Sequence, residues 1–409
     1  MKQRLSRVRQ PQKFDFILTL ILVLIFISSI LAIYAATPLV PAYIQTGGFN
    51  GLLGRQIQFY ILGIILIAII MYLGNDNLYT FAKIGYFIFL GLLLYLVFDK
   101  FVFSHLFVGR HVPFVKPVNG ATSWITLPFL GSLQPSEFMK VLLIIISAYI
   151  IVEHNTDKMD DSFESDIHLF IKIGKWAIAP LIAILIQPDT GIFIIIAFTI
   201  LLMLVCSGIR KEWIIGGIII IVVLLLIFFY LFYFNQDLFG KIFGTGYKVR
   251  RFYGWLYPEE YATSHGLQLY SSLLSLGSGG WFGHGIQANV ITIPEAQTDF
   301  IFAVIGMNFG FLGCIFVLGL CVALDLRLFT IAQRSKNNVE KLMIIGFLAM
   351  LIIQQFENIG MVVGIFPITG ITLPLISAGG SSLLSYMIAF GIVFNASMKA
   401  KKLSDYVYD

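Results

Sequence analysis

Ten long apolar stretches divide the chain, and the connections between them are more polar. Most stretches approach the roughly 20 residues that a helix needs to cross about 30 Å of hydrocarbon. The alternation with a period of two residues that marks a membrane barrel is absent. The pattern therefore predicts an all-α, polytopic membrane protein with ten transmembrane helices. The stretches lie at residues 15–36, 56–74, 80–98, 137–153, 168–187, 191–207, 213–234, 299–326, 341–365 and 371–398.

The apolar stretches leave no soluble domain, so we interpret residues 1–409 as one integral membrane domain. The first stretch is too long for the apolar core of a cleaved secretory signal and opens a series of similar stretches, so we expect it to be retained. Two connections, at 99–136 and 235–298, are long and rich in glycine, proline and aromatic residues. Loops of that length are usually functional or disordered.

The second long loop contains a helical pattern. Leu267, Tyr270, Leu273 and Leu274 form an apolar stripe at helical spacing. The stripe indicates a helix lying in the membrane interface, and a loop helix that packs on the bundle fits it equally well. The glycines of the following GSGGWFGHG are spaced unlike a dinucleotide fingerprint, so we interpret them as turns.

Charge sets the expected orientation. Only 12% of the residues are charged and 58% are hydrophobic, whereas about a quarter of a soluble domain is charged. With an even number of spans both termini share one side, and most of the 27 lysines and arginines lie there. This bias predicts cytoplasmic termini and extracellular long loops. The net charge of +5 suits anionic membrane lipids, and no basic strip interleaved with aromatic residues indicates nucleic-acid binding.

A charged pair lies at the expected start of the fourth span, in QPSEFMK. Pro135 suits the first position of a helix and Glu137 is favoured near its positive end, so the helix should begin here. Glu137 and Lys140 share a face, which makes mutual neutralisation the default. Lys140 also lies about one turn inside the membrane boundary, where an ionisable group indicates a functional site. A structural pair and a direct role toward a substrate therefore both stay open, and Trp124 of NGATSWI fits the interfacial belt of tryptophans.

Four further polar motifs fall on the same side of the predicted bundle. Asp189 in QPDTG can cap the helix that follows it, and Arg251 suits either a phosphate or a solvated surface. Asp299 follows Thr298, which can cap the eighth span and so place Asp299 in its first turn. The prolines, glycines and serines of 358–382 predict a re-entrant or broken segment that lines a cavity.

Three classes of function fit polar motifs that converge on the outer face of a helical bundle. A lipid-dependent enzyme would use Asp299, Arg251 and Lys140 on an amphiphilic substrate. A transporter or lipid flippase would use the same groups along a path, and a scaffold would use the loops to hold partners. Transporter sites lie near the midplane and many transporters have internal repeats. The sequence has neither a midplane charge cluster nor an obvious repeat, which favours the enzyme.

Eight motifs occur in an order that resembles the SEDS family (shape, elongation, division and sporulation), of the RodA and FtsW type. In chain order they are NGATSWI, QPSEFMK, QPDTG, GSGGWFGHG, PEAQTDFIF, NIGMVVG, PITGITLPLIS and GGSSLL. The resemblance implies a glycosyltransferase that polymerises lipid II, an undecaprenyl-pyrophosphate-linked disaccharide-peptide, at the outer face of the bacterial cytoplasmic membrane. It also implies a class B penicillin-binding protein, a transpeptidase, as partner. A flippase of the same precursor is the alternative.

The resemblance further implies roles for individual residues. Asp299 matches the essential aspartate of the family, Trp124 its motif tryptophan and Arg251 the arginine of its large outer loop. Glu137 and Lys140 match its charged pair. Four more polar residues are expected to bind the substrate with them: Gln268, Thr298, Ser377 and Ser381.

The chain departs from the family pattern at four positions. Ser123 stands where arginine is usual, His284 where lysine is common, Asn308 in place of a glutamate and Ala378 in place of an aromatic residue. These departures put in doubt the family roles of those four positions and leave Asp299 unaffected. The sequences KFDF before the first span and RQIQFY before the second favour the elongation-type member over the division-type member.

The implied chemistry needs a base for the acceptor sugar hydroxyl and cations to offset charge on the departing pyrophosphate. Asp299 is the candidate base, and Arg251 and Lys140 are the candidate charge stabilisers. The sequence leaves open whether the helix dipole, which favours the ionised carboxylate, or a dry site, which disfavours it, prevails at Asp299. A Mg²⁺ or Mn²⁺ ion on the pyrophosphate would fit this chemistry, but no ligand cluster requires one. The three cysteines lie in or at the edges of spans and encode neither a disulfide framework nor a zinc site.

Overall fold

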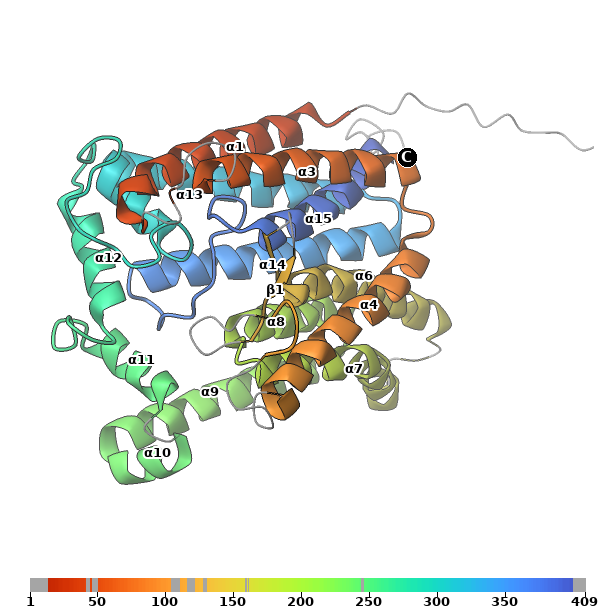
Figure 1. The fold of residues 1–409 in the computed structure, drawn as a ribbon. Coiled ribbons are helices and arrows are strands. Elements are labelled where there is room, and N and C mark those ends of the chain that lie inside the picture. The colour runs from red at the N-terminus through yellow and green to blue at the C-terminus, as the bar shows by residue number, and fades with distance from the viewer. Residues whose placement is uncertain are drawn as a thin grey trace, which may run out of the picture.

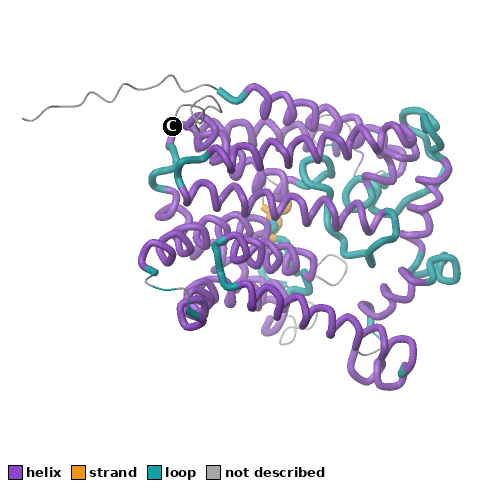
Figure 2. Tube along the Cα trace, turned by 180° about the vertical axis from the view of Figure 1, so that it is seen from behind, coloured by secondary structure: helices purple, strands orange, loops and turns teal. Residues whose placement is uncertain are grey.

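The structure, a computed structural model, describes residues 14–41, 45, 51–103, 111–115, 122–127, 131–158, 160, 162–243 and 246–399. Its helices lie side by side as a bundle (Figure 1), and β1 and β2 form a short antiparallel hairpin. The long loop that carries α11 and α12 lies at one end of the bundle, on the right in Figure 2, and the two strands lie nearer its middle. In chain order the elements are α1 (Phe16–Ala36), η1 (Thr37–Leu39), α3 (Leu52–Leu73), α4 (Leu78–Phe98), η3 (Asp99–Phe103), β1 (Ile125–Leu127), β2 (Gly131–Leu133), α6 (Pro135–Asp157), α7 (Phe163–Ile186), α8 (Thr190–Cys206), α9 (Lys211–Phe234), α10 (Gln236–Phe243), α11 (Tyr247–Leu256), α12 (Leu267–Ser278), α13 (Ile301–Arg334), α14 (Asn338–Val362) and α15 (Gly380–Lys399).

Each of the ten predicted spans falls on a helix. Among the described residues, nine helices are long and apolar enough to cross a membrane, and α8 is a shorter apolar helix of 17 residues. The all-α, membrane-spanning architecture is therefore confirmed, while the count of ten crossings stays a prediction. The largest difference in boundary is at the last span, which begins at Gly380 and not at residue 371.

The first and last spans meet at one end of the bundle. The ring of Phe14, just before α1, stacks on Phe394 of α15 at 5.5 Å between centroids. The Asp15 carboxylate, which also caps α1, pairs with Arg327 near the end of α13 at 2.7 Å. We call this end of the bundle the terminal end. The opposite end carries α12 and is called the loop end (Figure 1). Which side of a membrane each end faces stays a prediction.

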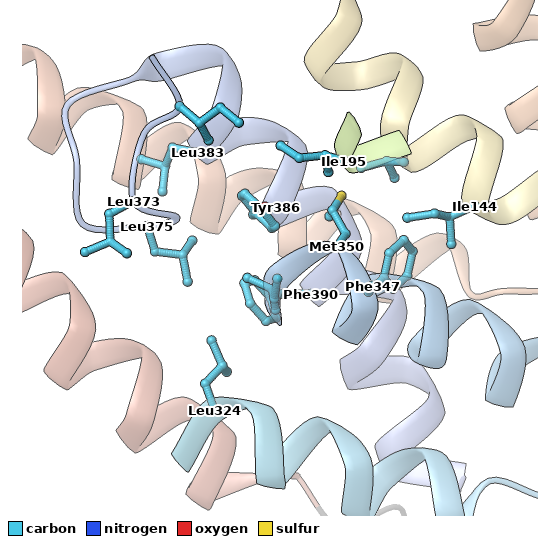
Figure 3. Packing of buried hydrophobic residues seen from close by; sticks show 14 of the residues in the cluster. Ile144, Ile195, Leu324, Phe347, Met350, Leu373, Leu375, Leu383, Tyr386 and Phe390 are labelled. Carbon is cyan, nitrogen blue, oxygen red and sulfur yellow. The ribbon is translucent and has the colours of Figure 1, made fainter. Parts of the chain in front are cut away.

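Helices α6, α14 and α15 form the centre of the bundle. Figure 3 shows Tyr386 and Phe390 of α15 in one cluster with Phe347 and Met350 of α14, all nearly inaccessible to solvent. In contrast, α9 is exposed along almost its whole length, and Phe232 is the one residue of it that is buried. A helix that is apolar all round and not enclosed by protein has the composition of a lipid-facing span.

Residues 363–379, which we call the re-entrant segment, leave helical structure after α14 and fold back into the bundle. Leu373, Leu375 and Ile376 are buried. The Tyr60 hydroxyl of α3 donates to the Leu375 carbonyl, and the Ser29 hydroxyl of α1 donates to the Ile376 carbonyl at 2.8 Å. Helix side chains thus satisfy peptide groups that the irregular backbone leaves free, as burial in a membrane protein requires. The prediction of a broken segment is confirmed, while its re-entry within a membrane and the cavity beside it stay predictions.

Helix α13 is broken at Gly310, where φ is +65° and the backbone leaves the helical range. The glycine-rich loop before it supplies the hydrogen bonds that the break removes. Two bonds run from the loop to helix carbonyls, and two run from helix amides to loop carbonyls. They join His284 N to Met307 O (2.9 Å), Gly285 N to Asn308 O (3.0 Å), Phe311 N to Gly280 O (2.8 Å) and Leu312 N to Trp281 O (3.2 Å).

The contact between the glycine-rich loop and α13 explains why asparagine can stand at position 308, where the family usually has glutamate. Asn308 is buried, accepts a hydrogen bond from the Ala288 amide at 2.9 Å and donates to the Val304 carbonyl at 2.9 Å. An uncharged amide can do both, because its carbonyl accepts and its amino group donates. The glycines of GSGGWFGHG therefore form turns, as predicted, and these turns dock on a helix break that the apolar pattern did not reveal.

Helix α12 has two unlike faces. Its serines turn inward, and the Ser272 hydroxyl donates to the Val362 carbonyl at the end of α14 at 2.8 Å. Leu267, Leu273 and Leu274 of the predicted stripe are exposed. The predicted helix is confirmed, and it packs on the bundle through serines and Leu269, while Leu267, Leu273 and Leu274 point outward. That these leucines lie in a membrane interface stays a prediction.

Candidate active site

Asp299 lies in a turn at the loop end, two residues before α13. The predicted cap is wrong, because α13 begins at Ile301 and its N-cap, Phe300, has no capping side chain. The Thr298 hydroxyl instead donates to the Glu295 carbonyl and to the Glu295 carboxylate, both at 3.3 Å. Thr298 thus closes the turn before the helix, and Asp299 lies just outside the first helical turn.

Two side chains tie this turn to the re-entrant segment. The Asn358 amide donates to the Asp299 carbonyl at 2.8 Å and to the Ile371 carbonyl at 2.7 Å. The Ser377 hydroxyl donates to the Thr298 carbonyl at 2.6 Å. These bonds hold the backbone of Asp299 and leave its carboxylate available. Ser377, a predicted substrate-binding residue, is thereby used in positioning Asp299.

The carboxylate of Asp299 lies against the start of the re-entrant segment. A methyl group at Gly370 would be 3.5 Å from Asp299 Oδ2, and Gly370 has φ of +78°, which a side chain would strain. Arg251 of α11 donates from Nη1 to the Ile368 carbonyl at 3.0 Å. The first part of the segment thus brings the predicted arginine and the predicted aspartate into one site.

Burial decides the question that the sequence left open about Asp299. Its side chain is half-buried, and removal from water raises its pKa to about 7; Glu295 pushes the pKa in the same direction and Arg251 opposes both. Desolvation disfavours the charged form of a carboxyl group. A carboxylate with a pKa near neutrality is matched to the work of a general base.

Glu137 and Lys140 form a buried pair. Lys140 Nζ lies 2.7 Å from Glu137 Oε2 and donates to Gln354 Oε1 at 3.0 Å. The Tyr386 hydroxyl donates to the same Gln354 oxygen at 2.6 Å, and Gln354 Nε2 donates to the Thr372 carbonyl of the re-entrant segment at 3.0 Å. Lys140 is 1% exposed. The geometry favours the structural interpretation of this pair, and a direct role of Lys140 toward substrate stays a prediction.

A second polar cluster surrounds Asp189. Its carboxylate caps α8, as predicted, and accepts hydrogen bonds from Gln134 Nε2 at 2.7 Å and from the Ser136 hydroxyl at 3.1 Å. Burial raises the pKa of Asp189 to about 6, against the lowering effect of these bonds. Ser381 accepts from the Gln134 amide at 2.9 Å and donates to the Ser132 carbonyl at 3.2 Å. Asp189 and Ser381 thus fasten the starts of α6, α8 and α15 together.

The remaining predicted residues are less closely connected to Asp299. Trp124 is half-buried directly before β1, and its neighbour Ser123 donates to the Gln187 carbonyl at 3.2 Å. Gln268 is half-buried on α12. The first residues of NGATSWI, 119–121, lie outside the described residues. Substrate binding by Trp124, Gln268, Thr298, Ser377 and Ser381 stays a prediction.

Sequence reasoning missed the uncharged residues that organise the site. Gln354, Asn358, Gln134 and Tyr386 make the hydrogen bonds described above, but an amide or a phenol in an apolar helix has no charge to single it out. Asn358 begins the motif NIGMVVG and Gln134 begins the motif QPSEFMK, and these two motifs were the available signals. Gln354 and Asn358 hold the re-entrant segment in place, Tyr386 holds Gln354, and Gln134 holds Asp189.

The described residues do not contain a ready-made metal site. No group of three or more histidine, cysteine, aspartate or glutamate side chains among them could hold a metal ion. That finding concerns protein ligands alone, and a Mg²⁺ or Mn²⁺ ion held mainly by the substrate pyrophosphate stays a prediction.

Comparison with known proteins places this site in context. A protein-family model described as cell cycle protein, of the FtsW, RodA and SpoVE type, matches residues 15–402. The chain is 34% identical over 367 residues to a probable peptidoglycan glycosyltransferase FtsW of Lactococcus lactis subsp. lactis (strain IL1403), covering 86% of this chain and 85% of that protein. It is 30% identical over 388 residues to stage V sporulation protein E of Bacillus subtilis (strain 168), covering 94% and 96%.

Two solved structures have the same fold. One belongs to work on the structural coordination of polymerization and crosslinking by a peptidoglycan synthase complex; its chain superposes with a TM-score of 0.70 at 22% identity, over 95% of this chain and 99% of that chain. The other is the crystal structure of the Thermus thermophilus rod shape determining protein RodA, with a TM-score of 0.60 at 23% identity, over 95% and 98%.

Proposed function

We propose, on the premise that this chain belongs to the family of FtsW, RodA and SpoVE cell cycle proteins, that Asp299 is the base of its transfer reaction. The chain is a multi-pass membrane protein and a peptidoglycan glycosyltransferase that polymerises lipid II in cell-wall synthesis. The observation that carries the proposal for Asp299 is its half-buried carboxylate at the mouth of α13, within electrostatic reach of Arg251.

In the proposed step, Asp299 accepts the proton of the acceptor sugar hydroxyl. The hydroxyl oxygen forms a bond to the anomeric carbon of the donor disaccharide. The bond between that carbon and the pyrophosphate oxygen breaks, and the lipid pyrophosphate leaves with the electron pair. Arg251 offsets the negative charge that grows on this leaving group, as fixed cations do in other phosphate-releasing sites.

Lys140 has a different part in this proposal. Its ammonium group is enclosed by Glu137 and Gln354. In this proposal Lys140 therefore stabilises the structure of the site and does not contact the substrate. Gln354 carries the effect to the re-entrant segment through the Thr372 carbonyl. The segment then holds Gly370 against Asp299 and Ile368 against Arg251.

The membrane location follows from the same premise. We place the protein in the bacterial cytoplasmic membrane, with the loop end and Asp299 facing outward, which agrees with the distribution of lysine and arginine. Proteins named FtsW, SpoVE and RodA are all similar to the chain. Assignment to the elongation-type member therefore stays a prediction.

Reconstitution tests the function directly. We expect the purified chain in liposomes, with its partner present, to convert lipid II into long glycan strands that run as a ladder on a gel and disappear on digestion with a muramidase. Movement of lipid II from one leaflet to the other without any lengthening of glycan would contradict the proposal and establish the flippase alternative.

The partner of this chain is proposed to be a class B penicillin-binding protein with a single membrane span. The long loops offer surface for contact, and a structural neighbour comes from a complex that coordinates polymerization with crosslinking. We expect the two proteins to co-purify from cross-linked membranes. Recovery of the chain alone, under conditions that retain other wall-synthesis complexes, would argue against the pairing.

A further inference from the structure

Glu295 has a backbone conformation that its side chain disfavours. It is one of few described residues other than glycine with a positive φ, at +54°. Such a conformation is strained for a residue with a side chain, and it persists only where the surroundings enforce it. Residues of this kind cluster at functional sites, and Glu295 is four residues before Asp299.

The hydrogen bonds of Glu295 explain what enforces the conformation. Its carbonyl accepts from the amides of Thr298 at 3.2 Å and Phe300 at 3.3 Å. Its carboxylate accepts from the Thr298 hydroxyl and from Gln297 Nε2, both at 3.3 Å. The turn that contains Asp299 is therefore held by hydrogen bonds to both the carbonyl and the carboxylate of Glu295.

Few charged groups face Asp299 from the elements around it. Glu295 is on its own turn, Arg251 comes from α11, and the re-entrant segment contains no titratable residue. From α14 the neighbouring titratable residue is Glu357, which is buried next to Asn358. Lys140 and Glu137 are occupied with each other on α6. Glu295 is exposed, and it is the carboxylate whose effect on the pKa of Asp299 opposes that of Arg251.

We infer that Glu295 is a positioning residue of the transfer reaction, which holds Asp299 at the mouth of α13 and makes it a stronger base. The inference rests on the proposed function of Asp299. Arg251 alone would favour ionised Asp299 and weaken its hold on a proton. A second carboxylate beside Asp299 opposes that effect, because like charges disfavour each other's ionised forms. The site can thus keep a cation for the leaving group without losing the base.

Glu295→Gln tests the electrostatic part, since glutamine keeps a carbonyl acceptor for Thr298 and Gln297 and removes the charge. We expect the acid limb of the pH profile of polymerisation to move to lower pH by about half a unit to one unit. The plateau rate should fall several-fold, because a weaker base transfers the proton less well. Glu295→Asp, which retains the charge, should keep the midpoint of the wild-type protein.

Glu259→Gln is the matched control, because Glu259 is an exposed carboxylate of the same long loop and lies outside the site. The pH profile of polymerisation by this variant should superpose on that of the wild-type protein. If Glu295→Gln does not fold, Glu295→Gly is titrated instead, because glycine accepts the positive φ. An unmoved midpoint in the folded variant overturns the inference about Glu295 while wild-type activity and its loss in Asp299→Asn still support the proposed function. An inactive wild-type protein contradicts the proposed function itself.

Discussion

Asp299→Asn is expected to abolish detectable glycan synthesis, with a loss of about 10²–10⁴-fold, the usual contribution of a general base. Asparagine keeps the shape of the side chain but cannot accept the hydroxyl proton. The backbone bonds to Asn358 and Ser377 do not involve the carboxylate, so the turn should survive. We therefore expect normal membrane insertion and normal association with the partner.

The measurement is polymerisation of lipid II in liposomes, with thermal unfolding as the check on folding. Asp76→Asn is the control, because Asp76 is 92% exposed at the terminal end and its pair with Lys399 is 3.7 Å long. Wild-type activity should also rise with pH through about 7, since the pKa of Asp299 is raised to about 7 and a base works only when deprotonated. Polymer formation by folded Asp299→Asn at the wild-type rate would remove Asp299 from its proposed role.

Lys140→Met is expected to lower the free energy of unfolding by about 3–5 kcal/mol, because it leaves the buried Glu137 carboxylate without its counter-ion. Glu137 is 4% exposed and Lys140 is 1% exposed, so water cannot replace the lost partner. Gln354 would also lose a donor to its carbonyl oxygen. The measurement is thermal unfolding in detergent, compared with Lys336→Met, whose side chain is exposed and whose effect should stay within about 0.5 kcal/mol.

Exchange of the two charges separates pairing from catalysis. In Glu137→Lys combined with Lys140→Glu, the attraction survives, but Gln354 must turn its amide to donate to residue 140. That turn disturbs its bonds to Tyr386 and Thr372, so we expect partial recovery of stability and activity over the single reversals. Full recovery of stability without any activity would show that the Lys140 ammonium group itself meets the substrate.

The positions of the helices could be predicted because a long run of apolar residues is by itself enough to indicate a transmembrane helix. The ends of α1, α4 and α9 lie within a few residues of the apolar stretches. The prolines, glycines and serines of 358–382 indicated a break, but the start of α15 at Gly380 could not be predicted from the apolar pattern, which continues through residues 371–379. The irregular path of these residues is also stabilised by distant hydrogen-bond donors, Tyr60 and Ser29. Apolar content does not record such partners.

Some features of the site could likewise be predicted from the sequence and others could not. Charged residues inside apolar surroundings, such as Lys140 and Asp299, were recognisable in the sequence because burying charge is costly. The cap assigned to Thr298 was wrong because its hydroxyl has a nearer acceptor, Glu295, in a turn that local spacing did not reveal. Asp299 also lies against Gly370, which is far away in sequence, so its surroundings could not be predicted from the local pattern.

The break at Gly310 links the insertion of α13 to the order of protein synthesis. Its four displaced peptide groups are satisfied by residues 280–285, which leave the ribosome before α13 does. Without them, each group in hydrocarbon would cost several kcal/mol. The translocon therefore receives α13 only after the chain that completes it has been made. If the gene were divided between residues 285 and 301, the second fragment would begin with α13. That helix would not insert stably into the bilayer until the first fragment had bound to it.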